Sequence, residues 1–250
     1  MLNIWLYSII SVIIISILSL IGIIFFSIRE KLLKDILIYA ISISTGALFG
    51  DAFIHLLPEA VKKNGFTIEI SLFLISGIVF SFIIEKILHW RHCHHQTTKT
   101  HPHPLSTMNL FGEGVHNFID GLIIAASYIA SIPIGIATTI AVIFHEGPHE
   151  LGNFSILVYA GIKKERALLY NFLISMTAIL GAVIGLLISS QSESILNFLI
   201  PFAAGNFIYI AGSDLIPEIH KDSEKISKAI LQLIMFLLGI GIMYVLLILG

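Results

Sequence analysis

The sequence contains very little cysteine and little charge. Its single cysteine, Cys93, excludes a disulfide within the chain and leaves the redox compartment open. Charged residues make up 12% of the chain, about half the share usual in soluble proteins. The net charge of −2 indicates no particular partner, and we expect neither a nucleic acid nor an organic cofactor. Hydrophobic residues, in contrast, make up 56% of the chain and the mean hydropathy is +0.95, so this is an integral membrane protein within a lipid bilayer.

Eight apolar stretches are long enough to cross the bilayer, which takes about 20 helical residues. Charged clusters separate these stretches, and the connections between them are short. The stretches are residues 2–28, 36–61, 67–88, 105–131, 134–162, 168–190, 195–219 and 226–249. The sequence therefore predicts an all-α integral membrane fold of eight transmembrane helices, in a single transmembrane domain over residues 1–250.

Basic residues gather at every second connection. All Lys and Arg residues except Lys62 and Lys63 lie around the ends of the first, third, fifth and seventh stretches. Cytoplasmic connections of membrane proteins are enriched in these residues, so we expect both termini to lie outside the cytoplasm, with the protein in the cell membrane. The first stretch has no small-residue cleavage site, and we interpret it as a retained helix rather than a signal peptide.

Two of the predicted helices end alike. Leu56-Leu57-Pro58-Glu59 closes the second stretch, and Leu215-Ile216-Pro217-Glu218 closes the seventh. These helices cross the membrane in opposite directions, as expected for an inverted repeat in which helices 1–3 and 6–8 flank helices 4 and 5. Binding sites in such proteins form near the midplane, between the repeats. The alternative is a chance likeness, because proline commonly ends a helix.

The third connection, residues 89–104, reads HWRHCHHQTTKTHPHP and is the one long polar stretch. Its candidate metal ligands are His92, His94, His95, His101 and His103. Short His-rich tracts bind metals such as Zn²⁺. We therefore expect a cytoplasmic loop that receives or senses metal, with a spacer of incidental histidine content as the alternative.

The fourth and fifth stretches contain metal-binding side chains in the middle of apolar runs, where a charged group in the membrane is costly. A charged residue at the centre of a membrane helix costs about 2.5–3.5 kcal/mol on insertion scales and is rarely present without a function. His116 and Asp120 are four residues apart, and so are His145 and His149. Residues with this spacing share one face of a helix. We expect the two faces to oppose each other and to form a four-ligand metal site.

Neighbouring residues extend this predicted site. Asn117 and Glu146 each come three residues before the second ligand of their helix, and Glu150 and Asn153 continue the line by one turn. Imidazole and carboxylate ligands suit Zn²⁺, Fe²⁺ and related divalent ions, whereas the lack of a thiolate argues against Cu⁺. On the second stretch, Asp51 and His55 are also four residues apart, which favours a role in the path of the ion.

The fifth stretch also matches a protease signature. His145-Glu146-Gly147-Pro148-His149 fits H-E-x-x-H, in which two His bind zinc and Glu is the base. An intramembrane zinc metalloprotease, with Asp120 as third ligand, is therefore an alternative function. Pro148 argues against it, because proline removes a backbone hydrogen bond and bends the helix, which we expect to free the carbonyl of Phe144 for water or an ion. A metal sensor, with tight binding and no flux, is a third possibility.

HNFIDG (116–121) and HEGPHELGNF (145–154) resemble the signatures HNFxDG and HExPHELGDF of the ZIP (Zrt/Irt-like) metal transporters. The likeness is to the subgroup whose fifth helix carries HExPHE. GDAFIHLLPEA (50–60) is similar to the second helix of that subgroup, and the resemblance extends through all eight stretches. It implies eight helices with outward termini, a His-rich cytoplasmic third loop and a binuclear metal site between the fourth and fifth helices.

The resemblance also implies a role for each ligand. The first metal site would be His116, Asp120, His145 and His149, and the second Asn117 and Glu146 with His149 and Asp120 shared. Asp51 and His55 resemble a route from the outer side. Asn153 stands where the family motif usually has Asp, which removes a charge one turn beyond the site. The sixth helix lacks the acidic residue that completes the second site in some relatives, so Asn171 or Ser175 would be a weak substitute.

The expected function is import of a divalent metal ion into the cytoplasm by alternating access, without enzymatic chemistry. Zn²⁺ is the leading transported substrate, ahead of Fe²⁺, Mn²⁺ and Cd²⁺, because imidazole suits Zn²⁺ better than the harder Mn²⁺. His145 supplies an imidazole where relatives with Glu resemble broader carriers of Mn²⁺ and Fe²⁺. We also expect a homodimer.

Overall fold

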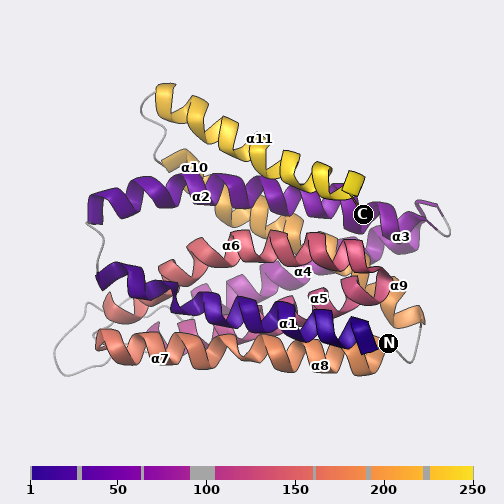
Figure 1. Cartoon of the computed structure of the whole chain (residues 1–250), viewed down its shortest axis with the longest axis horizontal. Coiled ribbons are helices and arrows are strands. Elements are labelled where there is room, and N and C mark those ends of the chain that lie inside the picture. The colour runs from indigo at the N-terminus through magenta and orange to yellow at the C-terminus, as the bar shows by residue number, and fades with distance from the viewer. Residues whose placement is uncertain are drawn as a thin grey trace.

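The computed structural model describes residues 2–26, 30–62, 65–90, 105–159, 162–189, 193–221 and 226–249, and every regular element in these ranges is helical. The α-helices are α1 (Leu2–Leu18), α2 (Glu30–Gly50), α3 (Leu57–Val61), α4 (Ile68–Trp90), α5 (Leu105–Ala130), α6 (Ile132–Tyr159), α7 (Lys164–Ser175), α8 (Thr177–Ser189), α9 (Glu193–Tyr209), α10 (Ile216–Lys221) and α11 (Ile226–Leu249). A 3-10 helix, η1 (Ser19–Phe26), continues α1, and two π-helical turns, η2 (Asp51–Leu56) and η3 (Ile210–Leu215), continue α2 and α9. The long helices form one bundle along a common direction (Figure 1).

Six helical segments of the described chain are long and apolar enough to cross a membrane. They are Leu2–Ile23, Ile38–Val61, Ile68–Ile87, Lys164–Ile188, Asn197–His220 and Ile226–Leu249. They match the first three and the last three predicted stretches, which confirms a multi-pass helical membrane protein. The fourth and fifth stretches are α5 and α6, with 26 and 28 residues. Both exceed the length of about 20 residues that a span takes, but their polar ligand residues lower their hydropathy, so the count of eight stays a prediction.

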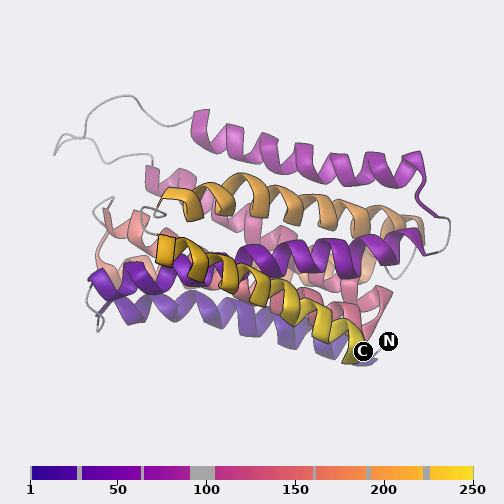
Figure 2. The ribbon, with the colours of Figure 1, turned by 90° about the horizontal axis from the view of Figure 1, so that it is seen from above.

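Both termini lie at the same end of the bundle (Figures 1 and 2). The helices α2, α7 and α11 begin at the opposite end, and α4 ends there. An even number of crossings produces this arrangement. The connections expected to be cytoplasmic therefore lie together at the end opposite the termini, while the side of the membrane that each end faces stays a prediction from the charge pattern.

Three pairs of helices approach too closely to admit a side chain between them: α2 with α11, α4 with α9, and α5 with α8. In each pair both helices place a glycine at the contact, and a Cβ added there would lie 2.0–2.2 Å from a carbonyl oxygen of the other helix. The glycines are Gly46 with Gly239, Gly77 with Gly205, and Gly121 with Gly181. Small residues at such positions allow membrane helices to pack backbone against backbone. These glycines therefore help to determine which helices pair.

The two helices that end in Pro-Glu have the same local backbone. In both, a six-residue π-helical turn is followed directly by a short α-helix, which begins at Leu57 in one case and at Ile216 in the other. The close-packed Gly46 and Gly205 each lie ten residues before the last residue of that turn. π-Helical turns are rare overall and often occur at functional sites. The likeness predicted from sequence thus extends to the backbone, and the inverted repeat that it favours stays a prediction.

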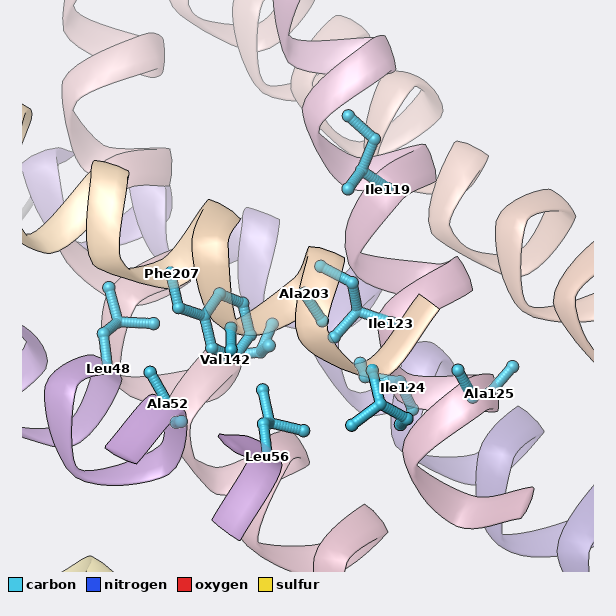
Figure 3. Packing of buried hydrophobic residues seen from close by; sticks show 14 of the residues in the cluster. Leu48, Ala52, Leu56, Ile119, Ile123, Ile124, Ala125, Val142, Ala203 and Phe207 are labelled. Carbon is cyan, nitrogen blue, oxygen red and sulfur yellow. The ribbon is translucent and has the colours of Figure 1, made fainter. Parts of the chain in front are cut away.

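The apolar core lies where α2 with η2, α5, α6 and α9 meet (Figure 3). Leu48, Leu56, Ile123, Val142 and Phe207 from these elements are all buried there. In contrast, α4 and α11 carry large apolar side chains on the outside, and only 11% and 17% of their spanning windows are buried. These two helices therefore face lipid, and the ligand-bearing α5 and α6 lie deeper in the bundle.

Candidate metal centre

The helices α5 and α6 pack against each other and bring their two motifs together. Nε2 of His116 lies 2.9 Å from Nε2 of His145 and 3.1 Å from Oε1 of Glu146. It also lies 3.7 Å from Oδ2 of Asp120, which is four residues further along α5. The metal-binding faces of the two helices therefore meet, with His116 as their point of contact.

The ligand side chains form two adjoining groups. The first group is His116, Asp120, His145 and Glu146, and the second group is Glu113, Glu146 and His149. In each group, one ligand atom per residue lies within 4.8 Å of all the others. Ligand atoms at about 2.0–2.2 Å from Zn²⁺ lie at most about 4.4 Å apart. A small inward movement of the side chains therefore suffices to enclose an ion in either group.

The first group is nearly closed to solvent. Asp120 and Glu146 are fully buried and His145 is 1% exposed, whereas the side chain of His116 is 20% exposed. Both carboxylate oxygens of Asp120, Oε2 of Glu146 and Nδ1 of His145 have no hydrogen-bond partner. Burying a carboxylate without a partner is costly. A divalent cation bound between these side chains would supply the missing partner, so the donor set fits a metal ion.

The structure distributes the predicted ligands differently from the expected arrangement. Glu146, rather than His149, is common to both groups, and His149 lies with Glu113 in the second. The ring of His149 still lies near that of His116, with centroids 4.7 Å apart and the ring planes tilted by 37°. Successive residues on a helix diverge by about 100°. Glu146 points about 60° away from His149 and about 100° away from His145, and its Oε1 lies 3.2 Å from Nε2 of His145 and 4.0 Å from Nδ1 of His149, so it reaches both groups.

Glu113 is a member of the site that the motifs do not include. It is 4% exposed, and its Oε1 lies 3.5 Å from Nδ1 of His149. Asn117 donates from Nδ2 to the same carboxylate oxygen at 3.0 Å, while Oδ1 of Asn117 has no hydrogen-bond partner. Glu113 comes three residues before His116, so the helical spacing that indicates the other ligands also indicates this one.

Glu150 and Asn153 continue along α6 but join neither group. Glu150 is fully buried, and its carboxylate accepts a hydrogen bond from Nδ2 of Asn171 on α7. Nδ2 of Asn153 lies 3.4 Å from Nδ1 of His149. Glu150 thus lies one turn beyond Glu146, and Asn153 lies one turn beyond His149, toward the end of α6.

Asp51 and His55 lie on η2, against the first half of α6. Oδ2 of Asp51 accepts a hydrogen bond from Oγ1 of Thr138 at 2.9 Å, and Nδ1 of His55 lies 3.8 Å from Oδ1 of Asp51. Thr138 precedes His145 by seven residues, or about 10 Å along the helix. This buried pair therefore lies on the other side of the first group from Glu150 and Asn153, outside both ligand groups.

The Phe144 carbonyl lacks an N–H donor from Pro148, as expected, and the hydroxyl of Ser44 on α2 lies within hydrogen-bond distance of this oxygen. The same hydroxyl also lies 2.8 Å from the carbonyl of Ala40, and a carbonyl oxygen accepts two hydrogen bonds, so binding of water or an ion to the Phe144 carbonyl stays a prediction. The helix α6 also runs without interruption from Ile132 to Tyr159. Because α6 is continuous through Pro148, this proline does not argue against the H-E-x-x-H protease. The loop ligands His92, His94, His95, His101 and His103 lie outside the described residues.

A family profile described as ZIP zinc transporter matches residues 2–109 and 91–247 of the chain. The chain belongs to the ZIP family. The matched residues include both ligand groups and the Asp51–Thr138 contact. ZIP proteins are transporters, so this protein is a transporter and not an enzyme, and the intramembrane metalloprotease is excluded.

Individual relatives differ in how much of the ZIP chain they match. Zinc transporter zipt-7.1 of Caenorhabditis briggsae is 28% identical over 311 residues, which cover 98% of this chain and 79% of the worm protein. Zinc transporter foi of Drosophila melanogaster is 40% identical over 54% of this chain, and human zinc transporter ZIP10 is 38% identical over 56%. Those alignments cover only 19% and 18% of the fly and human proteins, so the chain spans less than a fifth of their lengths.

Proposed function

We propose that this ZIP protein carries Zn²⁺ across the membrane into the cytoplasm. The observation that carries the proposal is the pair of ligand groups between α5 and α6, joined by Glu146 within the helix bundle. Imidazole nitrogen and carboxylate oxygen are common protein ligands of Zn²⁺. The relatives described above are named as zinc transporters, which favours Zn²⁺ as the substrate over Fe²⁺, Mn²⁺ and Cd²⁺.

Alternating access to this site is supported by two features. The matching turns η2 and η3 favour an inverted repeat, and transporters built this way expose a midplane site to each side in turn. The side chain of His149 is 37% exposed, whereas that of His145 is fully buried. On the far side of the first group, Asp51 is hydrogen-bonded to Thr138. This arrangement favours access from the His149 side, which the charge pattern assigns to the cytoplasm.

Uptake of Zn²⁺ by vesicles that contain the purified protein tests this proposal. A Zn²⁺-sensitive dye inside the vesicles reports the rate, and empty vesicles give the baseline. We expect uptake that saturates with external Zn²⁺. Uptake equal to the baseline would contradict transport, and saturable binding without uptake would indicate a metal sensor.

We also propose that the protein lies in the cell membrane, that both termini face outward and that it forms a homodimer. The clustering of Lys and Arg at alternate connections supports the orientation. Accessibility of a C-terminal tag to protease on intact cells tests the orientation, and the detergent-corrected mass of the solubilised protein tests the dimer.

His145→Glu is expected to widen selectivity toward Mn²⁺. His145 supplies one of the two imidazoles of the first group, and a carboxylate in its place gives a ligand set of harder oxygen donors. Imidazole favours Zn²⁺ over Mn²⁺, whereas carboxylates suit Mn²⁺. Competition of Mn²⁺ against Zn²⁺ uptake measures the effect, and unchanged competition would show that His145 is not a ligand of the first group.

Apparent Zn²⁺ affinity is expected to weaken in acid. A metal ion binds the unprotonated nitrogen of imidazole, whose ordinary pKa is about 6.5. Protons therefore compete with Zn²⁺ for His116, His145 and His149, and each ring that becomes protonated lowers the affinity by up to about tenfold per pH unit. Uptake at graded Zn²⁺ concentrations over about pH 5.5–7.5 measures this dependence. A flat affinity profile would contradict a site built on histidine.

A further inference from the structure

The second ligand group has an unusual composition, because two of its three members are buried carboxylates. Glu113 and Glu146 are 4% and 0% exposed, and both lie near Nδ1 of His149, at 3.5 Å and 4.0 Å. Two ionised carboxylates that share a buried site repel each other, and the repulsion is removed by a proton on one of them or by a cation between them. Oε2 of Glu146 has no hydrogen-bond partner, which leaves it free to bind such a cation.

The sixth predicted helix supplies no ligand to this group. It corresponds to α7 and α8, and its two polar candidates are engaged elsewhere: Asn171 with Glu150, and Ser175 with the backbone oxygen of Ser16 and the hydroxyl of Ser19. Neither belongs to a ligand group in the described residues. The carboxylate that faces His149 from outside α6 comes instead from α5, at Glu113.

We propose that Glu113 is a metal ligand that completes a second ion position, with Glu146 as the carboxylate shared between two ions. This inference rests on the proposed function, because it assigns a further ligand to the same transport site. Asn117 then acts as a positioning residue, since its Nδ2 holds Oε1 of Glu113 at 3.0 Å. The side chain of Asn153 also hydrogen-bonds Glu113. An Asp at position 153 would instead place a further negative charge against Glu113, so the departure from the family motif suits a carboxylate ligand here.

The two positions should differ in selectivity. The first group offers two imidazoles and two carboxylates, whereas the second offers one imidazole and two carboxylates. Oxygen ligands suit harder ions such as Mn²⁺, and nitrogen ligands suit Zn²⁺. The second position is therefore expected to accept Mn²⁺ or Fe²⁺ more readily than the first.

Metal binding by the purified full-length protein tests the assignment. The probes are Zn²⁺, counted by equilibrium dialysis, and Co²⁺, whose visible spectrum depends on its ligands. The wild-type protein is expected to bind two equivalents between α5 and α6, after subtraction of metal held by the His-rich loop. That share is measured with a variant in which alanine replaces the loop residues His92, His94, His95, His101 and His103. Glu113→Gln is expected to keep the first equivalent at wild-type affinity and to weaken the second at least tenfold, with a changed spectrum for the second Co²⁺. Glu113→Asp, which keeps the carboxylate, should retain part of the second equivalent.

The control is Glu85→Gln, which makes the same change on α4 at a carboxylate bound to the hydroxyl of Tyr209. It should keep both equivalents. Two equivalents of wild-type affinity and an unchanged Co²⁺ spectrum in Glu113→Gln would overturn the role of Glu113 while leaving zinc transport intact. Failure of the wild-type protein to bind Zn²⁺ would instead overturn the proposed function. If Glu113→Gln binds no metal at all, recovery of the first equivalent in Glu113→Asp supports the proposal, and its absence overturns it.

Discussion

Replacement of Glu146 by glutamine is expected to reduce Zn²⁺ uptake at least about 100-fold, to the level of empty vesicles. Glu146 is the residue common to both ligand groups, and it is fully buried. Glutamine has nearly the same shape but carries no charge, so two cations in the site would lose the carboxylate between them. Loss of partners that only orient metal ligands already costs about 10–100-fold, and the loss of a shared ligand should cost more. The measurement is the initial uptake rate in vesicles with equal amounts of protein.

The same substitution at Glu85 is the control, because it distinguishes the loss of a metal ligand from the general effect of losing a carboxylate in a membrane helix. Glu85→Gln removes one carboxylate from a membrane helix but leaves both ligand groups intact. It should transport Zn²⁺ at the wild-type rate. Uptake by Glu146→Gln within a few-fold of wild type would show that the two groups do not bind the transported ion.

Gly121→Val is expected to prevent normal folding. A Cβ at Gly121 would lie 2.0 Å from the carbonyl oxygen of Ala178 on α8, and this backbone cannot move aside as a side chain would. The helices would have to separate along their contact, at a cost of at least about 3 kcal/mol. We expect little monodisperse protein after purification and a lower unfolding temperature. Gly121 closes the HNFIDG motif, so this position of the motif serves helix packing and not metal binding.

A matched control for this variant lies on α11. A Cβ at Gly241 would have nothing within 4 Å, so Gly241→Val adds the same side chain to a membrane helix without a collision. It should purify and unfold like the wild-type protein. Normal behaviour of Gly121→Val as well would show that α5 and α8 are not packed as closely as described.

The sequence was sufficient to predict the positions of the helices, because hydropathy and length are properties of each segment by itself. The predicted stretch 67–88, for example, is α4, Ile68–Trp90. The same reasoning identified α5 and α6 as the helices that carry the ligands. Spacing along one helix predicted that His116 and Asp120 share a face, and in the structure Nε2 of His116 lies 3.7 Å from Oδ2 of Asp120.

The remaining details depend on how two helices pack, which spacing within one helix does not determine. The sharing of Glu146 between two groups follows from the rotation of α6 relative to α5. The hydrogen bond from Ser44 to Phe144 depends on the approach of α2 to α6. Sequence periodicity does not predict the π-helical turns either. The i, i+4 spacing of Asp51 and His55 is that of an ordinary α-helix and gives no sign of the wider turn. Glu113, in contrast, could have been predicted from the sequence, because it lies three residues before His116 and residues with this spacing share one face of a helix.

The contact between the Ser44 hydroxyl and the Phe144 carbonyl couples movement of the ligand-bearing helix α6 to entry of water between α2 and α6. The oxygen has no donor of its own because Pro148 lacks an N–H, so it depends on α2 for a partner. If α6 moved away from α2 in a dry bundle, the carbonyl would lose this partner at a cost of about 1–3 kcal/mol. If water entered as the helices parted, the carbonyl would bond to it and most of that cost would disappear. Separation of α2 from α6 and wetting of the space between them should therefore occur together.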